Sequence, residues 1–180
     1  FSLFPYLRKK NMKKILLYFT LFGTILAYVV LFFVDIKLQS GNINFGIICF
    51  ELAGNLITSS DIVNYWADNN NLSLAAFSIG FDYLFILFYV SFIFIWTSIL
   101  SDGFYNKTAK YFANFIMLIT VLAGILDMIE NYSLMQVLGG SQDNLWPAMA
   151  YYFASFKFGF LFIAISYNLI ISIIKRFIII

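Results

Sequence analysis

The sequence predicts an all-α membrane protein, a four-transmembrane-helix bundle with both termini in the cytoplasm. Composition, the length of the apolar runs and the placement of basic residues support this prediction. Of the 180 residues, 62% are hydrophobic and only 11% are charged, whereas a soluble domain has about 25% charged residues. The apolar residues gather in runs at least as long as the ~20 residues that a helix needs to cross a bilayer. We therefore expect one integral membrane domain over residues 1–180.

The four apolar runs place the predicted spans at approximately 15–34, 74–100, 111–138 and 147–174. The first run exceeds the ~7–15 apolar residues of a signal-peptide core, and no small-residue cleavage site follows it, so we expect it to remain as a span. Residues 1–14 form a basic N-terminus. Because Met12 stands directly before the first run, we also predict a natural start at Met12, with residues 1–11 upstream of it.

Basic residues distinguish the two sides of the predicted bundle. They precede the first span, lie between the second and third spans, and follow the fourth: Arg8, Lys9, Lys10, Lys13, Lys14, Lys107, Lys110, Lys175 and Arg176. The two connections on the other side contain Lys37 as their only basic residue, together with five acidic residues. The positive-inside rule therefore places both termini in the cytoplasm.

The outer connection, residues 35–73, is too long for a simple turn and predicts a short interfacial helical region between the first and second spans. Residues 43–53 are apolar but too few to cross the bilayer, so we interpret them as an interfacial or re-entrant segment. A short helix is expected next, with Ser59 or Ser60 as its N-cap. The asparagines at 69–71 are expected to end it.

Small residues recur at helical spacing and predict where the spans meet one another, because membrane helices approach closely at small side chains. The small residues on these faces include Thr20, Gly23, Thr24 and Ala27 in the first span, Thr120, Ala123 and Gly124 in the third, and Ala150, Ala154 and Ala164 in the fourth. The opposite faces carry Phe, Ile and Leu, and we expect these faces to contact lipid.

Ionisable side chains inside three spans give the clearest indication of a site. At 1.5 Å of rise per residue, Asp82 and Glu130 each lie ~12 Å below the outer ends of their spans. Asp127 lies about one turn deeper than Glu130, and Lys157 lies ~15 Å below the outer end of the fourth span. All four groups thus fall at a similar depth in the outer half of the membrane. A buried, unpaired charge costs several kcal/mol, so a carboxyl group must keep a proton, a cation must bind, or water must enter.

The candidate site follows from this convergence. We expect Lys157 to pair with Asp127 or Glu130, and these three are the candidates for catalysis. Candidate ligand-binding residues are Asp82, Tyr89, Asn131 and Glu51. Asp82 has three possible partners, which are Tyr83, Tyr89 and Asn131. Glu51 either caps a short helix or folds over the cluster as a fourth carboxylate.

Composition excludes several kinds of site. The chain has no histidine, a single cysteine and a net charge of +2. This excludes an intramolecular disulfide, a CxxC redox pair, histidine ligation of a metal and a basic surface for nucleic acid. We predict neither a metal site nor a cofactor.

The sequence leaves three functions open. The preferred one is binding or conversion of a small or lipid-like molecule in an outward-facing polar pocket, and whether a reaction occurs is left open. The second is a proton- or cation-coupled carrier, although all the acids lie in the outer half. The third is an accessory or assembly subunit, in a homo-oligomer or a larger membrane complex, whose polar residues hold helices together at about 0.6–2 kcal/mol per contact.

Five features occur in a fixed order along the chain: FELAGN at 50–55, GFDYLF at 80–85, DMIEN at 127–131, Trp146 and Lys157. This order resembles a group of small four-span bacterial membrane proteins of unknown function, over about residues 50–164. The resemblance implies a bacterial inner (cytoplasmic) membrane as the location and the same choice of polar residues. It implies no activity.

Overall fold

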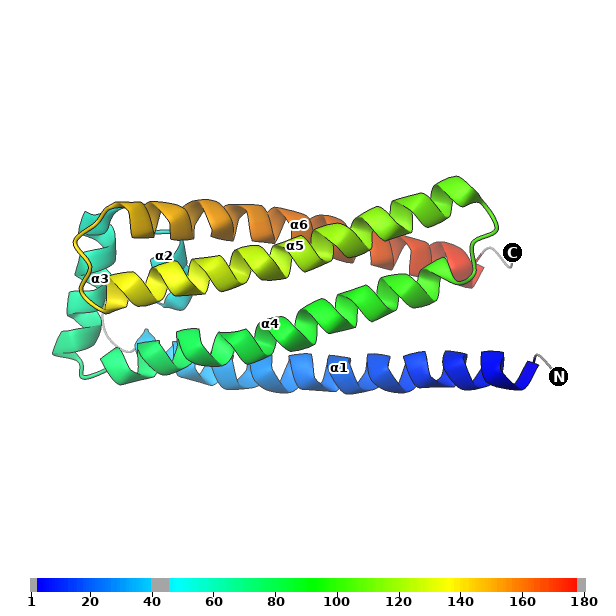
Figure 1. Cartoon of the computed structure of the whole chain (residues 1–180). Helices are drawn as coiled ribbons and strands as arrows, with labels where there is room; N and C mark the ends of the chain where they lie inside the picture. Colours follow the sequence, from blue (N-terminus) through cyan, green and yellow to red (C-terminus); the bar gives the residue numbers. More distant parts are fainter. Residues whose placement is uncertain (1–2, 40–45, 178–180) are drawn as a thin grey trace.

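The computed structural model describes residues 3–39 and 46–177, with side chains from residue 11 onward. This part of the chain is helical and contains no strand. Its helices are α1 (Leu3–Leu38), α2 (Ile47–Glu51), α3 (Leu56–Asp68), α4 (Leu72–Ser101), α5 (Lys107–Leu138) and α6 (Leu145–Phe177). The four long helices run alongside one another as an elongated bundle, with α2 and α3 at one end (Figure 1).

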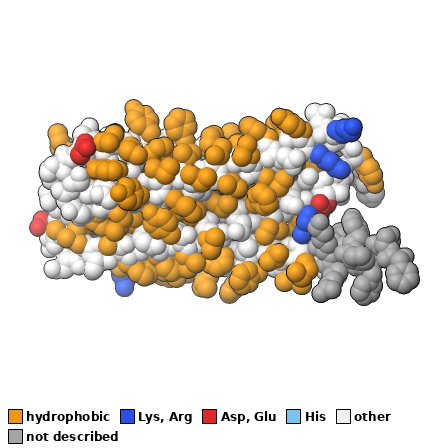
Figure 2. Space-filling view, in the orientation of Figure 1, with side chains coloured by type: hydrophobic (Ala, Val, Ile, Leu, Met, Phe, Trp, Pro, Cys, Tyr) orange, Lys and Arg blue, Asp and Glu red, His pale blue; other side chains and the backbone are white. Residues whose placement is uncertain are grey.

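The four long helices contain the candidate membrane spans, which are Asn11–Leu38, Leu72–Ser101, Lys107–Leu138 and Leu145–Phe177. Each is long and apolar enough to cross a membrane, which confirms the prediction of an all-α protein with four such helices. Figure 2 shows hydrophobic side chains covering the middle of one face, with charged side chains at its two ends. Every span extends beyond the predicted limits by at least one residue at one or both ends, because helices continue past the last apolar residue.

The helices pack in chain order. Helix α1 lies against α4, α4 lies against α5, and α5 lies against α6. Helix α4 also touches α6, whereas α1 makes no comparable contact with α5 or α6. Helices α1 and α6 therefore pack mainly on other helices and make little contact with each other.

Small residues allow α4, α5 and α6 to approach one another closely, as the sequence predicted. Ala123, Ala150, Ala154 and Ala164 are fully buried. A Cβ atom added at Gly124 of α5 would lie only 2.6 Å from Val90 Cγ2 of α4. These positions hold no side chain that would separate the helices, so the backbones of α4, α5 and α6 can come together.

In the region between α1 and α4, helix α3 begins earlier in the sequence than predicted. Asn55, not Ser59 or Ser60, is the N-cap, and its side-chain oxygen accepts a hydrogen bond from the Thr58 backbone N–H at 2.9 Å. Both serines lie inside the helix, because asparagine is as good a cap as serine and already satisfies the exposed N–H group. The helix ends at Asp68, directly before the three asparagines, as expected.

Helix α2 packs on α3 at this end of the bundle. Of the predicted interfacial segment 43–53, residues 43–45 lie outside the described residues and 47–51 form α2. Trp66 of α3 is fully buried and packs edge-to-face on Phe50 of α2, with ring centroids 5.1 Å apart. This contact joins α2 to α3 in the apolar core at this end of the molecule.

Candidate functional site

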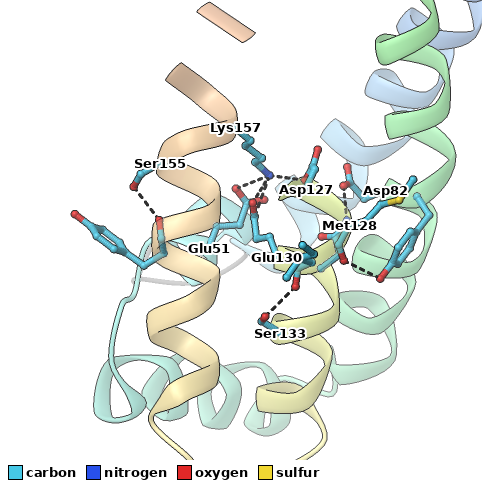
Figure 3. A network of polar contacts seen from close by, with 12 residues as sticks. Glu51, Asp82, Asp127, Met128, Glu130, Ser133, Ser155 and Lys157 are labelled. Atoms are coloured by element: carbon cyan, nitrogen blue, oxygen red, sulfur yellow. Dashed lines mark hydrogen bonds and ion pairs between the residues drawn. The ribbon is translucent and has the colours of Figure 1, made fainter. Parts of the chain in front are cut away.

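Lys157 is the centre of a buried cluster of ionisable groups. Its Nζ atom donates hydrogen bonds to Asp127 Oδ1 at 2.7 Å and to Glu130 Oε1 at 2.9 Å. Figure 3 shows the lysine side chain reaching from α6 to these two acids on α5. Lys157 is 5% exposed and Glu130 is 0% exposed, so water contributes little to the stabilisation of these charges. Lys157 was predicted to pair with Asp127 or Glu130, and it pairs with both.

Helical spacing brings the two acids to one lysine. Asp127 and Glu130 are three residues apart on α5 and so lie on one face, which is the face that packs against α6. On α6, Ala150 and Ala154 are fully buried and precede Lys157 by seven and three residues, on the same face. Because these alanines keep α5 and α6 close, the ammonium group of Lys157 can reach the acids.

Helix α4 adds a second set of polar contacts. The Asn131 side-chain amide donates to Asp82 Oδ2 at 2.7 Å, and the Tyr89 hydroxyl donates to Asp127 Oδ2 at 2.7 Å. The Tyr83 hydroxyl donates to the backbone oxygen of Met128 at 3.3 Å. Asn131 is therefore the partner of Asp82, and Tyr89 instead orients Asp127, so both oxygens of Asp127 have donors.

Glu51 comes from α2 and covers the cluster from the end of the bundle where α2 and α3 lie (Figure 3). Its Oε2 atom lies 3.6 Å from Lys157 Nζ and is buried without a hydrogen-bond donor. Burial raises the pKa of the Glu51 carboxyl above its ordinary value of 4.5, Lys157 opposes this rise, and Asp127 reinforces it. Of the two alternatives predicted for Glu51, the geometry matches a fourth carboxylate that folds over the cluster.

A cavity of about 620 Å³ adjoins the cluster. We call it the groove. Its polar lining at one end includes Glu51, Asp82, Tyr89, Asp127 and Lys157. The rest is mainly apolar and comes from α1, α2, α4 and α6: Tyr28, Leu31, Phe32, Ile47, Ile48, Phe85, Phe92, Ile93, Trp96, Phe158, Leu161 and Ile165.

The groove runs along the bundle. Its α4 lining extends from Asp82 to Trp96, which is ~21 Å at 1.5 Å of rise per residue. Tyr28 and Phe32 of α1 line it from one side, and Phe158 and Ile165 of α6 line it from the other. The sequence did not predict this apolar wall. Phenylalanine and isoleucine on the face of a groove give the same pattern as residues that contact lipid, so no signal in the sequence distinguishes the two.

Polar contacts also join α4 to α6 nearer the end of the bundle where α6 finishes. The Thr97 hydroxyl lies 3.0 Å from Asn168 Oδ1, and the indole N–H of Trp96 donates to the Ser172 hydroxyl at 3.1 Å. Ile86 and Ile93 of α4 are buried in an apolar cluster that also contains Tyr89. Of the four residues in these contacts Trp96 lines the groove, whereas Thr97, Asn168 and Ser172 do not.

Within the described ranges, no group of three or more cysteine and acidic side chains is placed to hold a metal ion. The fold and the site thus define a helical bundle with four candidate membrane-spanning helices and a buried cluster of carboxyl groups around one lysine. Comparisons with protein-family models, with curated proteins and with solved structures find no match to the chain. These comparisons therefore give no support to the resemblance to small bacterial membrane proteins.

Proposed function

We propose that this protein binds a small, lipid-like molecule in the groove, with the polar head at the ionisable cluster and the apolar part along α4. One observation carries the proposal: a single cavity of about 620 Å³ joins the buried cluster to a long apolar wall. Ligand pockets typically enclose about 300–1,000 Å³ and combine apolar walls with a few convergent polar groups. Asp127, Glu130 and Lys157 are the groups in the cluster that could act on a bound head.

The position of the groove suits entry from the bilayer. It is lined by α1 and α6, which make little contact with each other, and its wall residues Tyr28, Phe32 and Phe158 are each partly exposed. An amphiphile could therefore enter sideways between these two helices without crossing the end of the bundle. The apolar wall formed by Ile93, Trp96 and Ile165 favours a hydrocarbon chain over a hydrated ion. The groove is therefore better suited to binding an amphiphile than to transporting an ion.

The proposal places the cluster in the outer half of a cell membrane. Helix α1 begins and α6 ends at the same end of the bundle (Figure 1). Figure 2 shows Lys and Arg side chains gathered at this end, and Lys37 is the only basic residue in the two connections at the other. By the positive-inside rule, the end where α1 begins and α6 ends is on the cytoplasmic side. The cluster, which lies nearer the other end, is then on the outer side.

Native mass spectrometry of the purified protein tests the proposal. The wild type, released from a neutral detergent, is expected to carry an additional mass of one lipid-sized molecule. Thr24→Phe introduces a ring into the groove from α1, and the bound fraction should fall by about 10-fold, since the lost contact area is worth more than ~1.4 kcal/mol.

The matched control is Ile25→Phe, which introduces the same ring at the neighbouring position. Ile25 is exposed and does not line the groove, so this variant should retain the molecule. Wild-type protein that carries no additional mass would contradict the proposal. Equal retention by the two variants would also contradict it, because bound lipid would then lie elsewhere on the surface.

A further inference from the structure

More acidic groups than basic groups line the groove. Asp35, Glu51, Asp82 and Asp127 contribute carboxyl groups to the lining, and Lys157 contributes the only ammonium group there. Asp35 already accepts a hydrogen bond from the Ile47 backbone N–H at 2.7 Å, whereas the other three acids belong to the cluster. Glu130, which the lysine also contacts, brings a fourth carboxyl group to the cluster. The cluster therefore has four acids and one base among the described residues.

Lys157 has little capacity left for an anionic ligand. An ammonium group has three donors. Lys157 donates to Asp127 Oδ1 at 2.7 Å and to Glu130 Oε1 at 2.9 Å, and its Nζ atom also lies 2.8 Å from Glu130 Oε2 and 3.6 Å from Glu51 Oε2. A phosphate or carboxylate head in the groove would meet the nearby acids before it met an unoccupied donor, so an anion is disfavoured.

The acids, by contrast, have two buried oxygens without a hydrogen-bond donor, Glu51 Oε2 and Glu130 Oε2. Glu51 Oε2 is buried, has no hydrogen-bond donor and lies 3.6 Å from the ammonium group of Lys157. Asp82 is only half-buried and lines the same cavity. A head that donates hydrogen bonds and carries positive charge would satisfy these oxygens and compensate the excess of acids.

Aromatic rings stand beside the acids in the groove. Phe85 is three residues from Asp82 on α4 and lies 5.2 Å from Tyr89 and 6.5 Å from Tyr28, measured between ring centroids. All three rings line the cavity. Ring faces attract ammonium groups at distances of about 6 Å or less, so these rings reinforce the preference of the acids for a cation.

From these observations we propose that the ligand is an amphiphile with an ammonium head, that is, a lipid or single-chain amine, whose hydrocarbon chain lies between α1 and α6. This inference rests on the proposed function and specifies the class of ligand. The head would lie near Glu51 and Asp82, and the chain would extend toward Trp96.

Quenching of tryptophan fluorescence tests the inference. The probes are dodecylamine, dodecanol and dodecanoate, each with bromine at the end of the chain, added to the protein in a neutral detergent. Trp96 lines the groove, so a bound chain should quench its emission, and Trp96→Phe should remove most of that signal. The amine is expected to bind at least ~10-fold more tightly than the alcohol or the carboxylate, the effect of about one charge-assisted hydrogen bond.

Two variants test the head position. Asp82→Asn and Glu51→Gln should each lower the affinity for the amine by about 10-fold and leave that for the alcohol unchanged. Asp102→Asn is the control, because Asp102 pairs with Lys13 away from the groove, and it should change neither affinity. Glu51 lies on the short helix α2 and Asp82 on α4, so the two variants change the head site from different elements.

The outcomes separate this inference from the proposed function. Equal affinities for all three probes, or an unchanged preference for the amine in both variants, would overturn the ammonium head and leave a lipid-binding groove in place. Quenching by none of the probes, or undiminished quenching in Trp96→Phe, would overturn both.

Discussion

Replacing Lys157 by methionine should destabilise the protein strongly. Methionine keeps an unbranched, flexible stem and fills the same space, so the main loss is the ammonium group. That group donates to Asp127 and Glu130 at 2.7 and 2.9 Å, and the lysine is only 5% exposed. Removal of one partner from a buried ion pair costs about 3–5 kcal/mol, because the remaining charge has no compensation.

An exposed ion pair in the same protein provides the matched comparison. Lys13 contacts Asp102 at 2.6 Å, but the two side chains are 24% and 52% exposed. Such pairs contribute about 0–1 kcal/mol, since water and salt screen them. Lys13→Met therefore removes the same chemical group at a similar distance, and we expect it to cost less than about 1 kcal/mol.

The assay is reversible unfolding in mixed micelles, with a denaturing detergent added in steps and helix content followed by circular dichroism. The free energy of unfolding of Lys157→Met should fall by about 3–5 kcal/mol. Adding Glu130→Gln to Lys157→Met should recover part of this loss, because one uncompensated carboxyl group is then neutral. If Lys157→Met costs no more than Lys13→Met, the ammonium group does not stabilise the cluster and the reasoning is wrong.

Two further predictions concern helix packing and pH. Gly124→Ala should lower the free energy of unfolding by about 1–3 kcal/mol, because its Cβ would lie 2.6 Å from Val90 Cγ2. Gly80→Ala, which has open space around it, should instead stabilise α4 by up to ~1 kcal/mol, and equal effects would contradict the close approach of α4 and α5. Because the pKa of Glu51 is raised above 4.5, the folded state holds a proton that the unfolded state releases, so stability falls as the pH rises from about 4.5 toward that raised pKa. The thermal midpoint of Glu51→Gln should vary less than that of wild type across this window, and parallel curves would refute the assignment.

Local patterns in the sequence determined much of the fold. The four apolar runs predicted four long helices, and the small residues at helical spacing predicted the contacts of α4, α5 and α6. The depth of Asp82, Asp127, Glu130 and Lys157 predicted a shared cluster. These features follow from hydrophobic length, helical rise and the cost of burying charge, all of which depend on residues close together in the chain.

Only the tertiary structure decided which groups meet. Asp82 had three possible partners, and the rotation of α4 against α5 selects Asn131 and directs Tyr89 to Asp127. The position of Glu51 over Lys157 depends on how α2 folds back across the bundle. The groove exists because α1 packs on α4 and leaves a space beside α6. Helix rotation and packing result from many contacts between distant segments, and the periodicity of one helix does not record them.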